Sequence, residues 1–199
     1  MKLKSTLICA MVASIASFAS ITFMSGAANA QTYKIDPNHT YPSFAADHKG
    51  LSFWRGKFNK TSGSITLDRA AKTGTMQVTI DANTIDFGME KMNAHAKSKD
   101  MFDVAQFPSI SYKGTSMQFE GDKLVAVDGE LTLLGVTKPV RLVVNQFKCI
   151  QDAMSKREIC GADASAEIKR TDFGLDYAVQ YGFAPEVRLS IQVEAAKVE

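Results

Sequence analysis

The stretch GELTLLGVTKPVRLVV, residues 129–144, contains two short alternating segments on either side of a break with Gly and Pro. Leu131 and Leu133 share one face of the first segment, because successive side chains of a β-strand point to opposite faces. Beyond the break, three apolar side chains share one face: Val140, Leu142 and Val144. This pattern predicts an antiparallel hairpin with one apolar side and a turn at residues 135–139. Pro139 lacks a backbone N–H, so we expect it at the start of the second strand.

Most of the chain outside this hairpin also shows strand-like alternation. Further strands are predicted at residues 33–36, 43–49, 64–68, 75–81, 109–113, 116–120, 123–127, 162–169 and 186–194. Residues 87–102 lack this alternation, and Met89, Met92 and Ala96 recur there at near-helical spacing, which predicts one short helix. We therefore expect an all-β fold of about eight antiparallel strands, with the helix near one end.

Antiparallel strands in this number either pack as a sandwich or close into a barrel, and closure removes exposed strand edges. An eight-stranded barrel has room inside for side chains or for one small ligand. Ala162, Ala164 and Ala166 form a row of small residues on one face of a predicted strand. Small residues on an inward face leave space, which favours a barrel with a cavity. A tight sandwich crossing is the alternative explanation of these alanines.

Residues 1–30 have the three parts of a secretory signal peptide. Two lysines near the start form a basic region, residues 7–24 are apolar or small, and an ANA motif ends at Ala30. We expect cleavage after Ala30, export to the periplasm and a single mature domain at 31–199. An N-terminal membrane anchor is the alternative, but no charged stop-transfer flank follows the apolar run.

The charges and cysteines exclude several classes of protein. The formal net charge is +2 and no basic cluster occurs, so neither nucleic acid nor an anionic membrane surface is indicated as a partner, and we expect no stable membrane insertion. Cys9 lies in the predicted signal peptide, which leaves Cys149 and Cys160 for the mature chain. Two cysteines in an exported chain predict one disulfide across a polar hairpin tip, and their spacing does not fit a CxxC redox or metal pair.

Seven segments of the mature chain match, in order, the pattern of a known family. They are YKIDPNHT (33–40), FAADHKGLS (44–52), GKFNKTSGSITLD (56–68), IDANTIDFG (80–88), AHAKSKDMFDVAQFPSISYKGTS (94–116), GELTLLGVTKPVRL (129–142) and IKRTDFGL (168–175). Together they resemble the YceI family of exported lipocalin-like barrels. The resemblance implies an antiparallel eight-stranded lipocalin-like barrel whose tunnel holds an amphiphile with a polyisoprenoid or similar long tail. It also implies a binding protein without catalysis, with no cofactor other than the bound lipid.

The chain departs from the family pattern in the helical segment. The family usually carries an Arg-Asp pair where this chain has Met92 and Asn93, and a Leu where it has Ala96. Replacing a charged pair by Met and Asn makes that end of the expected tunnel less polar.

The predicted ligand-binding residues lie on the apolar strand faces, in the helical segment and at strand ends. They are Phe44, His48, Phe53, Met76, Val78, Ile80, Met89, Met92, Phe102, Leu131, Leu133, Leu142, Ala164, Ala166, Arg170, Phe173, Leu189 and Ile191. The methionines suit either a lid over a flexible tail or a core plug at one barrel end. His48 is the best candidate for hydrogen-bonding a polar head. Arg170 either pairs with Asp172 to fix a loop or faces a quinone or phosphate oxygen.

Metal and catalytic sites have weaker support in the sequence. His39, His48 and His95 could together bind zinc, but none are paired at i, i+2 or i, i+4, and hydrogen bonds at turns or at the barrel rim explain them as well. No G-x-S-x-G elbow occurs, so we expect neither a hydrolase nor another enzyme.

We interpret the sequence as a periplasmic carrier that holds an isoprenoid lipid, of quinone or polyprenyl type, in an apolar tunnel. A fatty-acid or fatty-amide carrier is the alternative within the same class. Other classes are an enzyme or redox partner acting on an isoprenoid lipid, and a structural module with a filled barrel. Whether the protein is a monomer or a homodimer stays open. A hollow barrel interior is the feature that the carrier hypothesis requires.

Overall fold

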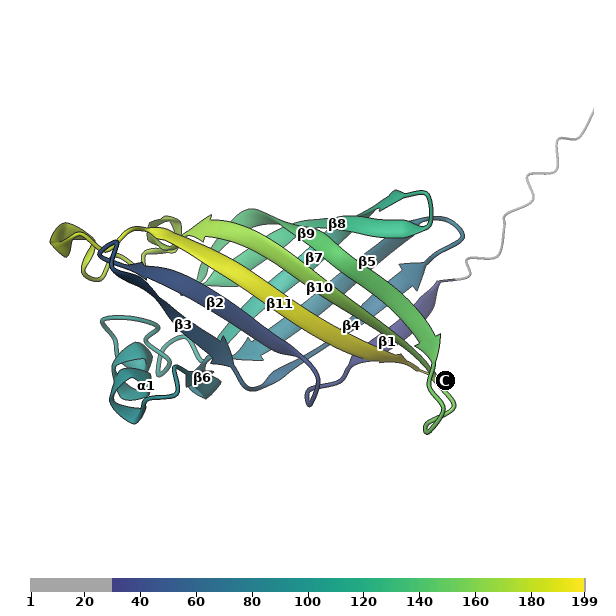
Figure 1. Ribbon diagram of the computed structural model, residues 1–199, viewed down its shortest axis with the longest axis horizontal. Coiled ribbons are helices and arrows are strands. Elements are labelled where there is room, and N and C mark those ends of the chain that lie inside the picture. Colours follow the sequence, from purple (N-terminus) through teal and green to yellow (C-terminus); the bar gives the residue numbers. More distant parts are fainter. Residues whose placement is uncertain (1–29, 199) are drawn as a thin grey trace, which may run out of the picture.

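The computed structural model describes residues 30–198 (Figure 1). Residues 1–29, which make up nearly all of the predicted signal peptide, lie outside the described residues, as does residue 199. Cleavage after Ala30 and export therefore stay predictions.

Strand segments make up most of the described chain. They are β1 (Gln31–Ile35), β2 (Tyr41–His48), β3 (Ser52–Phe58), β4 (Thr61–Asp68), β5 (Thr73–Asp81), β6 (Ile85–Asp86), β7 (Ser109–Glu120), β8 (Lys123–Leu133), β9 (Val136–Gln151), β10 (Glu158–Lys169) and β11 (Glu186–Lys197). The helical elements are α1 (Glu90–Lys97) and three short 3-10 turns, η1 (Ala82–Thr84), η2 (Arg170–Phe173) and η3 (Val179–Tyr181). The short helix predicted within residues 87–102 is confirmed.

The strands form one closed antiparallel sheet. Its order is β1-β4-β5-β7-β8-β9-β10-β11-β2-β3-β6, and an additional pairing of β1 with β11 closes the ring. Some consecutive segments together form one long strand with a break in it. This holds for β1 and β2, for β3 and β4, and for β5 and β6. β1 and β2, for example, both pair with β11. The segments therefore amount to eight long strands, and the predicted eight-stranded barrel is confirmed (Figure 1).

The breaks within these three long strands lie next to one another and are crossed by backbone hydrogen bonds. The N–H of Asp36 donates to the oxygen of Glu194 at 2.9 Å, and the N–H of Asn59 donates to that of Thr84 at 3.2 Å. Beyond the breaks, β2, β3 and β6 carry the wall onward to the end of the barrel that holds α1 (Figure 1). We call this the mouth end. It also holds the β2–β3 turn and the connection between β10 and β11.

The hairpin predicted at 129–144 is present, but its turn is shorter than expected. Leu134 and Gly135 form it, with φ of 50° and 74°, as in a two-residue type I′ turn. Pro139 therefore lies inside β9, and its placement at the strand start was wrong. Pro139 is opposite Glu130 of β8, and counting outward from the turn shows that this is a non-hydrogen-bonded pair. On the other side of β9, the pairing with β10 stops at Val143, before it reaches Pro139. The missing N–H of Pro139 thus removes no ladder hydrogen bond.

Two predicted strand boundaries were also wrong. The segments expected at 109–113 and 116–120 form one strand, β7, with an irregular register between Gly114 and Ser116. The segment at 123–127 runs on into the first strand of the hairpin as β8. An irregularity of this kind breaks the two-residue alternation without ending the pairing, so it imitates a strand end in the sequence.

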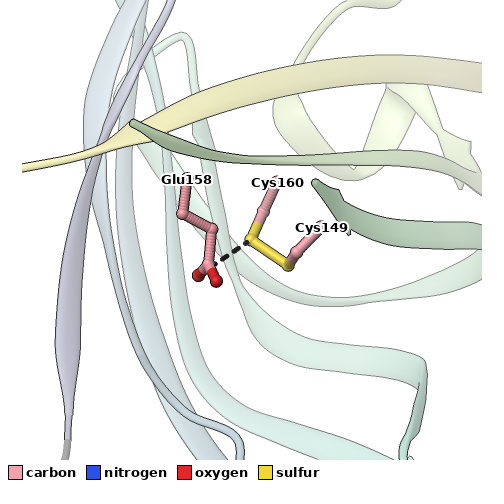
Figure 2. Close-up of side chains that lie close together, drawn as sticks. All are labelled: Cys149, Glu158 and Cys160. Atoms are coloured by element: carbon pink, nitrogen blue, oxygen red, sulfur yellow. Dashed lines mark hydrogen bonds between the residues drawn. A yellow bond between two sulfur atoms is a disulfide. The ribbon is translucent and has the colours of Figure 1, made fainter. Parts of the chain in front are cut away.

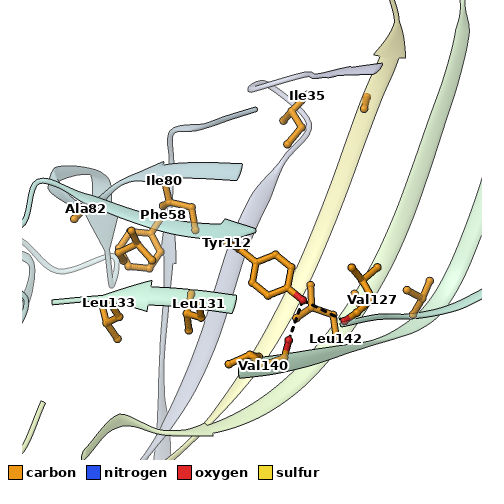
Figure 3. Close-up of a cluster of buried hydrophobic side chains, with 14 of the residues drawn as sticks. Ile35, Phe58, Ile80, Ala82, Tyr112, Val127, Leu131, Leu133, Val140 and Leu142 are labelled. Atoms are coloured by element: carbon orange, nitrogen blue, oxygen red, sulfur yellow. Dashed lines mark hydrogen bonds between the residues drawn. The ribbon is translucent and has the colours of Figure 1, made fainter. Parts of the chain in front are cut away.

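Buried side chains point inward from the strands around the barrel (Figure 3). Among them, the hydroxyl of Tyr112 reaches the backbone oxygens of Val127 and Val140, at 3.1 and 2.9 Å. Burial raises the pKa of Tyr112, so the phenol stays a hydrogen-bond donor. Ala96 is fully buried in this core and so packs α1 against the barrel.

The two ends of the described chain lie together at the far end of the barrel, away from α1 (Figure 1). Tyr33 of β1 stands opposite Lys197 of β11, and the N–H of Val198 donates to the oxygen of Thr32 at 2.8 Å. The turn between β9 and β10 lies at this same end (Figure 1).

Candidate functional site

A cavity of about 470 Å³ occupies the inside of the barrel. All eight long strands, α1 and the β10–β11 connection contribute to its wall. The volume falls in the range of ligand pockets, roughly 300–1,000 Å³. The hollow interior that the carrier hypothesis requires is therefore present.

Fourteen of the predicted ligand-binding residues lie in the wall of this cavity. They are Phe44, His48, Met76, Val78, Ile80, Met92, Phe102, Leu131, Leu133, Leu142, Ala164, Arg170, Leu189 and Ile191. Ala162 lines it as well, beside Ala164 on the inner face of β10, so two of the three alanines that predicted space do border it. Contact of these residues with a ligand stays a prediction.

Four predicted residues lie elsewhere, so their placement in the cavity was wrong. Phe53 points to the outer face of β3, where the guanidinium of Arg188 lies 4.8 Å from the centre of its ring. Met89 is the N-cap residue of α1 and is 53% exposed. Phe173 is buried in the core at η2, and Ala166 packs against the core outside the cavity wall.

Aromatic rings border the cavity at the mouth end. The ring of His48 stacks on Trp54, with centroids 4.6 Å apart and planes 5° apart, and meets Phe183 edge-on at 5.0 Å. His95 of α1 packs against Tyr177 with centroids 4.8 Å apart. Trp54 and Tyr177 are 37% and 46% exposed, whereas wall residues at the far end are buried. The cavity therefore opens to the surface here, between the β2–β3 hairpin, α1 and the β10–β11 connection.

Met92 and Asn93, two of the three α1 residues that depart from the family pattern, make different contacts. Met92 lines the cavity. Asn93 holds the chain that leads into the helix, because its Oδ1 accepts the N–H of Phe87 at 2.7 Å and its Nδ2 donates to Asp86 at 2.9 Å. The hydrogen bonds from Asn93 and from the Gly88 N–H keep the pKa of Asp86 below its usual range. Neither Met92 nor Asn93 brings a charge to the cavity.

Arg170 is a buried cation in the wall, only 8% exposed. Its guanidinium donates to four backbone oxygens of the β10–β11 connection: those of Leu175 (2.7 Å), Tyr177 (2.9 Å), Ala184 (3.3 Å) and Phe183 (3.4 Å). Burial lowers the pKa of Arg170. The expected pair with Asp172 is not among the ion pairs of the described chain, so Arg170 fixes the loop through backbone oxygens instead.

Hydroxyl groups in the inner wall are mostly occupied by the protein. Tyr33 donates to the carboxylate of Glu158, and burial together with this bond raises the pKa of Tyr33 to about 12. Thr40 donates to the backbone oxygen of Glu194 at 3.3 Å. The hydroxyl of Thr61 has no hydrogen-bond partner, but surrounding atoms cover it. The interior beyond the mouth therefore offers little to a polar ligand group.

The predicted disulfide between Cys149 and Cys160 is confirmed, and it joins directly opposite residues of β9 and β10 (Figure 2). The Sγ of Cys160 lies 4.0 Å from Oε1 of Glu158. These three residues are the one cluster of potential metal ligands within residues 30–198. Because the two sulfurs are bonded to each other, they are not available as thiolate ligands.

The three histidines considered for zinc make separate contacts. The Nδ1 of His39 lies 2.8 Å from Oδ2 of Asp36, whereas His48 and His95 pack against the rings at the mouth. Sequence reasoning did not assign the other mouth residues, Trp54, Phe87, Tyr177 and Phe183. Within residues 30–198, no helix combines the length and the hydropathy needed to cross a lipid bilayer.

Comparisons with known proteins place these features in a family. A model of the YceI-like domain matches residues 33–195. The Protein YceI of Salmonella agona is 35% identical over 184 residues, which cover 90% of this chain and 94% of that protein. Among solved structures, Burkholderia cenocepacia BcnA aligns with a TM-score of 0.67 and 24% identity over 80% of this chain and 98% of its own. A polyisoprenoid binding domain from Saccharophagus degradans aligns with a TM-score of 0.63 and 16% identity, covering 84% of this chain and 99% of that domain. At these identities the two structures share the fold.

Proposed function

The chain belongs to the YceI-like domain family, and from this premise we propose that it is a periplasmic carrier that encloses the tail of an isoprenoid lipid, of quinone or polyprenyl type. The observation that carries the proposal is the apolar cavity of about 470 Å³ inside a closed barrel. The description of the Saccharophagus degradans domain as polyisoprenoid binding agrees with it. The disulfide agrees with an exported protein, since disulfides persist in oxidising compartments.

The energetics of burial favour a long tail. Each buried methylene contributes ~0.8 kcal/mol, so one five-carbon isoprene unit contributes at most ~4 kcal/mol. Association costs roughly 4–15 kcal/mol in lost freedom before any net affinity appears. One or two units would barely offset that cost, whereas three or more give useful affinity from burial alone.

The distribution of polar groups gives the lipid a direction. His48, His95 and Tyr177 line the cavity where it reaches the surface, and the buried guanidinium of Arg170 donates to the backbone oxygen of Tyr177. The inner hydroxyls are bonded to protein or covered. A lipid with its tail inside and its head at the mouth therefore leaves no polar ligand group unpaired in an apolar environment.

Native mass spectrometry of the exported protein tests this proposal. We expect bound masses that differ by whole isoprene units and an extracted lipid that is chemically unaltered. Delipidated protein should bind geranylgeraniol well and geraniol hardly at all, because affinity follows the number of buried units.

Other outcomes point to the alternatives. A fatty acid or fatty amide as the bound mass, with palmitic acid preferred over geranylgeraniol, would replace the ligand class. A chemically altered lipid recovered after incubation would favour an enzyme. Absence of both co-purified lipid and uptake would overturn the carrier hypothesis.

A further inference from the structure

Large apolar side chains are exposed mainly around the mouth. Ten such residues are exposed within residues 30–198, and six of them belong to the segments that border the mouth. We define the mouth rim by five: Leu51 and Trp54 of the β2–β3 hairpin, Met89 at the start of α1, and Tyr177 and Tyr181 of the β10–β11 connection. The sixth, Phe53, lies on the outside of β3 under Arg188.

The rim residues belong to three elements, and ring contacts join these elements to one another. His95 of α1 packs against Tyr177 of the β10–β11 connection. Leu51, at the β2–β3 turn, is 82% exposed, and Tyr181 is 68% exposed. The contact between His48 and Phe183 joins the hairpin to the β10–β11 connection. The exposed apolar groups thus border the opening of an apolar cavity, although His48 stacks on one side of Trp54 and His95 packs against Tyr177.

The chemistry of the rim matches a membrane surface. Trp and Tyr combine an apolar ring with a polar group, and they concentrate where lipid tails meet headgroups. The hairpin from 47 to 57 carries three cations, Lys49, Arg55 and Lys57, against the single anion Asp47. Asp172 and Asp176 in the β10–β11 connection bring the number of anions to three, so the exposed charges of these two segments balance. Insertion of apolar side chains is therefore the main contribution to docking.

We propose that the mouth rim docks on the surface of a phospholipid bilayer, with Leu51 inserted among the lipids and the cavity open toward the membrane. The inference rests on the proposed function, because a long isoprenoid tail must pass between a bilayer and the cavity without crossing water. Docking of this kind is reversible contact with the interface and differs from insertion across the membrane.

Flotation of the full exported protein with vesicles tests the docking directly. The vesicles are phosphatidylcholine, alone or with a minority of phosphatidylglycerol. We expect comparable binding to both, because the exposed charges of the rim segments balance and the docking is by apolar insertion. Leu51→Asp should reduce binding at least tenfold, because a charge replaces an inserted apolar side chain. The matched control is Met154→Asp, in the β9–β10 turn at the far end, where Met154 is 92% exposed and the change should leave binding unaltered.

Trp54 supplies an independent readout, since it is the only tryptophan of the chain. On vesicle binding its emission should shift to shorter wavelength and be quenched by brominated lipids, and Leu51→Asp should abolish both effects. Circular dichroism checks that each variant is folded.

Uptake of geranylgeraniol from detergent solution separates this inference from the carrier proposal. Leu51→Asp should retain that uptake while losing vesicle binding. A protein that binds vesicles but takes up no lipid would refute the carrier proposal alone. Absence of vesicle binding, or equal losses in Leu51→Asp and Met154→Asp, would overturn the docking inference. So would self-association in the absence of vesicles that Leu51→Asp abolishes, because the rim would then be a dimer interface.

Discussion

Substituting Ala164 by Leu tests the hollow interior, because the sign of the stability change depends on whether space is present. Ala164 is on the inner face of β10, between Val144 of β9 and Ile191 of β11, and all three residues line the cavity. Leu adds three carbons, so filling empty apolar space should stabilise the delipidated protein by up to ~2.4 kcal/mol at ~0.8 kcal/mol per carbon. For a domain of this size that corresponds to a rise in Tm of about 5–10 °C. In a fully packed core the same change would cost about 1–3 kcal/mol.

The same variant should bind lipid more weakly. If the added side chain displaces two methylenes of the tail, the loss is ~1.6 kcal/mol, somewhat more than tenfold in Kd. Circular dichroism during heating gives Tm, and the change in Trp54 emission on addition of geranylgeraniol gives Kd. Asp163→Leu is the matched control, because Asp163 is the exposed neighbour on the outer face of β10. A lower Tm for Ala164→Leu, or unchanged lipid affinity, would refute the view that this part of the barrel is kept empty for a ligand.

Three further predictions concern the mouth, the disulfide and the far end. Arg170→Met removes the donor to four backbone oxygens, so it should lower the free energy of unfolding by about 3 kcal/mol. It should also speed hydrogen exchange of the β10–β11 connection. Unchanged exchange would contradict the role of Arg170 in holding this connection. Replacing Cys149 and Cys160 by Ser opens a loop with a sequence separation of 11 and should cost about 2–3 kcal/mol in denaturant unfolding, and reductant should affect the wild type alone. The hydrogen bond from Tyr33 lowers the pKa of Glu158 from its ordinary 4.5, so this carboxylate stabilises the fold above that pH and the stabilisation is lost as pH falls through the lowered value. The stability difference between the wild type and Glu158→Gln, measured by urea unfolding, should therefore be largest above pH 4.5 and shrink in acid; a constant difference would exclude this linkage.

Alternation along the sequence predicted the inner face of the barrel well, because closure forces every second residue of each strand inward. Leu189 and Ile191 of the strand predicted at 186–194 do line the cavity, together with Val187 and Val193 on the same face of β11. Trp54 could have been found in the same way, since it lies four residues before Phe58 on β3 and so shares its inward face. Phe53 was predicted to contact the ligand because it is aromatic. It is the neighbour of Trp54 in the sequence, however, and therefore lies on the opposite, outer face of β3.

The mouth could not be predicted from periodicity. Tyr177 and Phe183 lie in a connection held by the four hydrogen bonds of Arg170, and such long-range contacts leave no repeating pattern in the sequence. Met89 was assigned by its apolar character, but it precedes the first turn of α1 and faces outward. The turn at Leu134 and Gly135 was missed because Leu is an unusual residue at positive φ.

The meeting of β1 with the end of β11 has a practical consequence. Because Thr32 and Val198 are hydrogen-bonded neighbours on the side remote from the opening, a short peptide linker could join the two ends of the described chain. New ends could then be cut elsewhere, as in circular permutation. A dye, purification handle or surface tether attached next to Thr32 or Val198 would project away from the entrance. The immobilised protein would therefore present its opening to vesicles or lipid in solution.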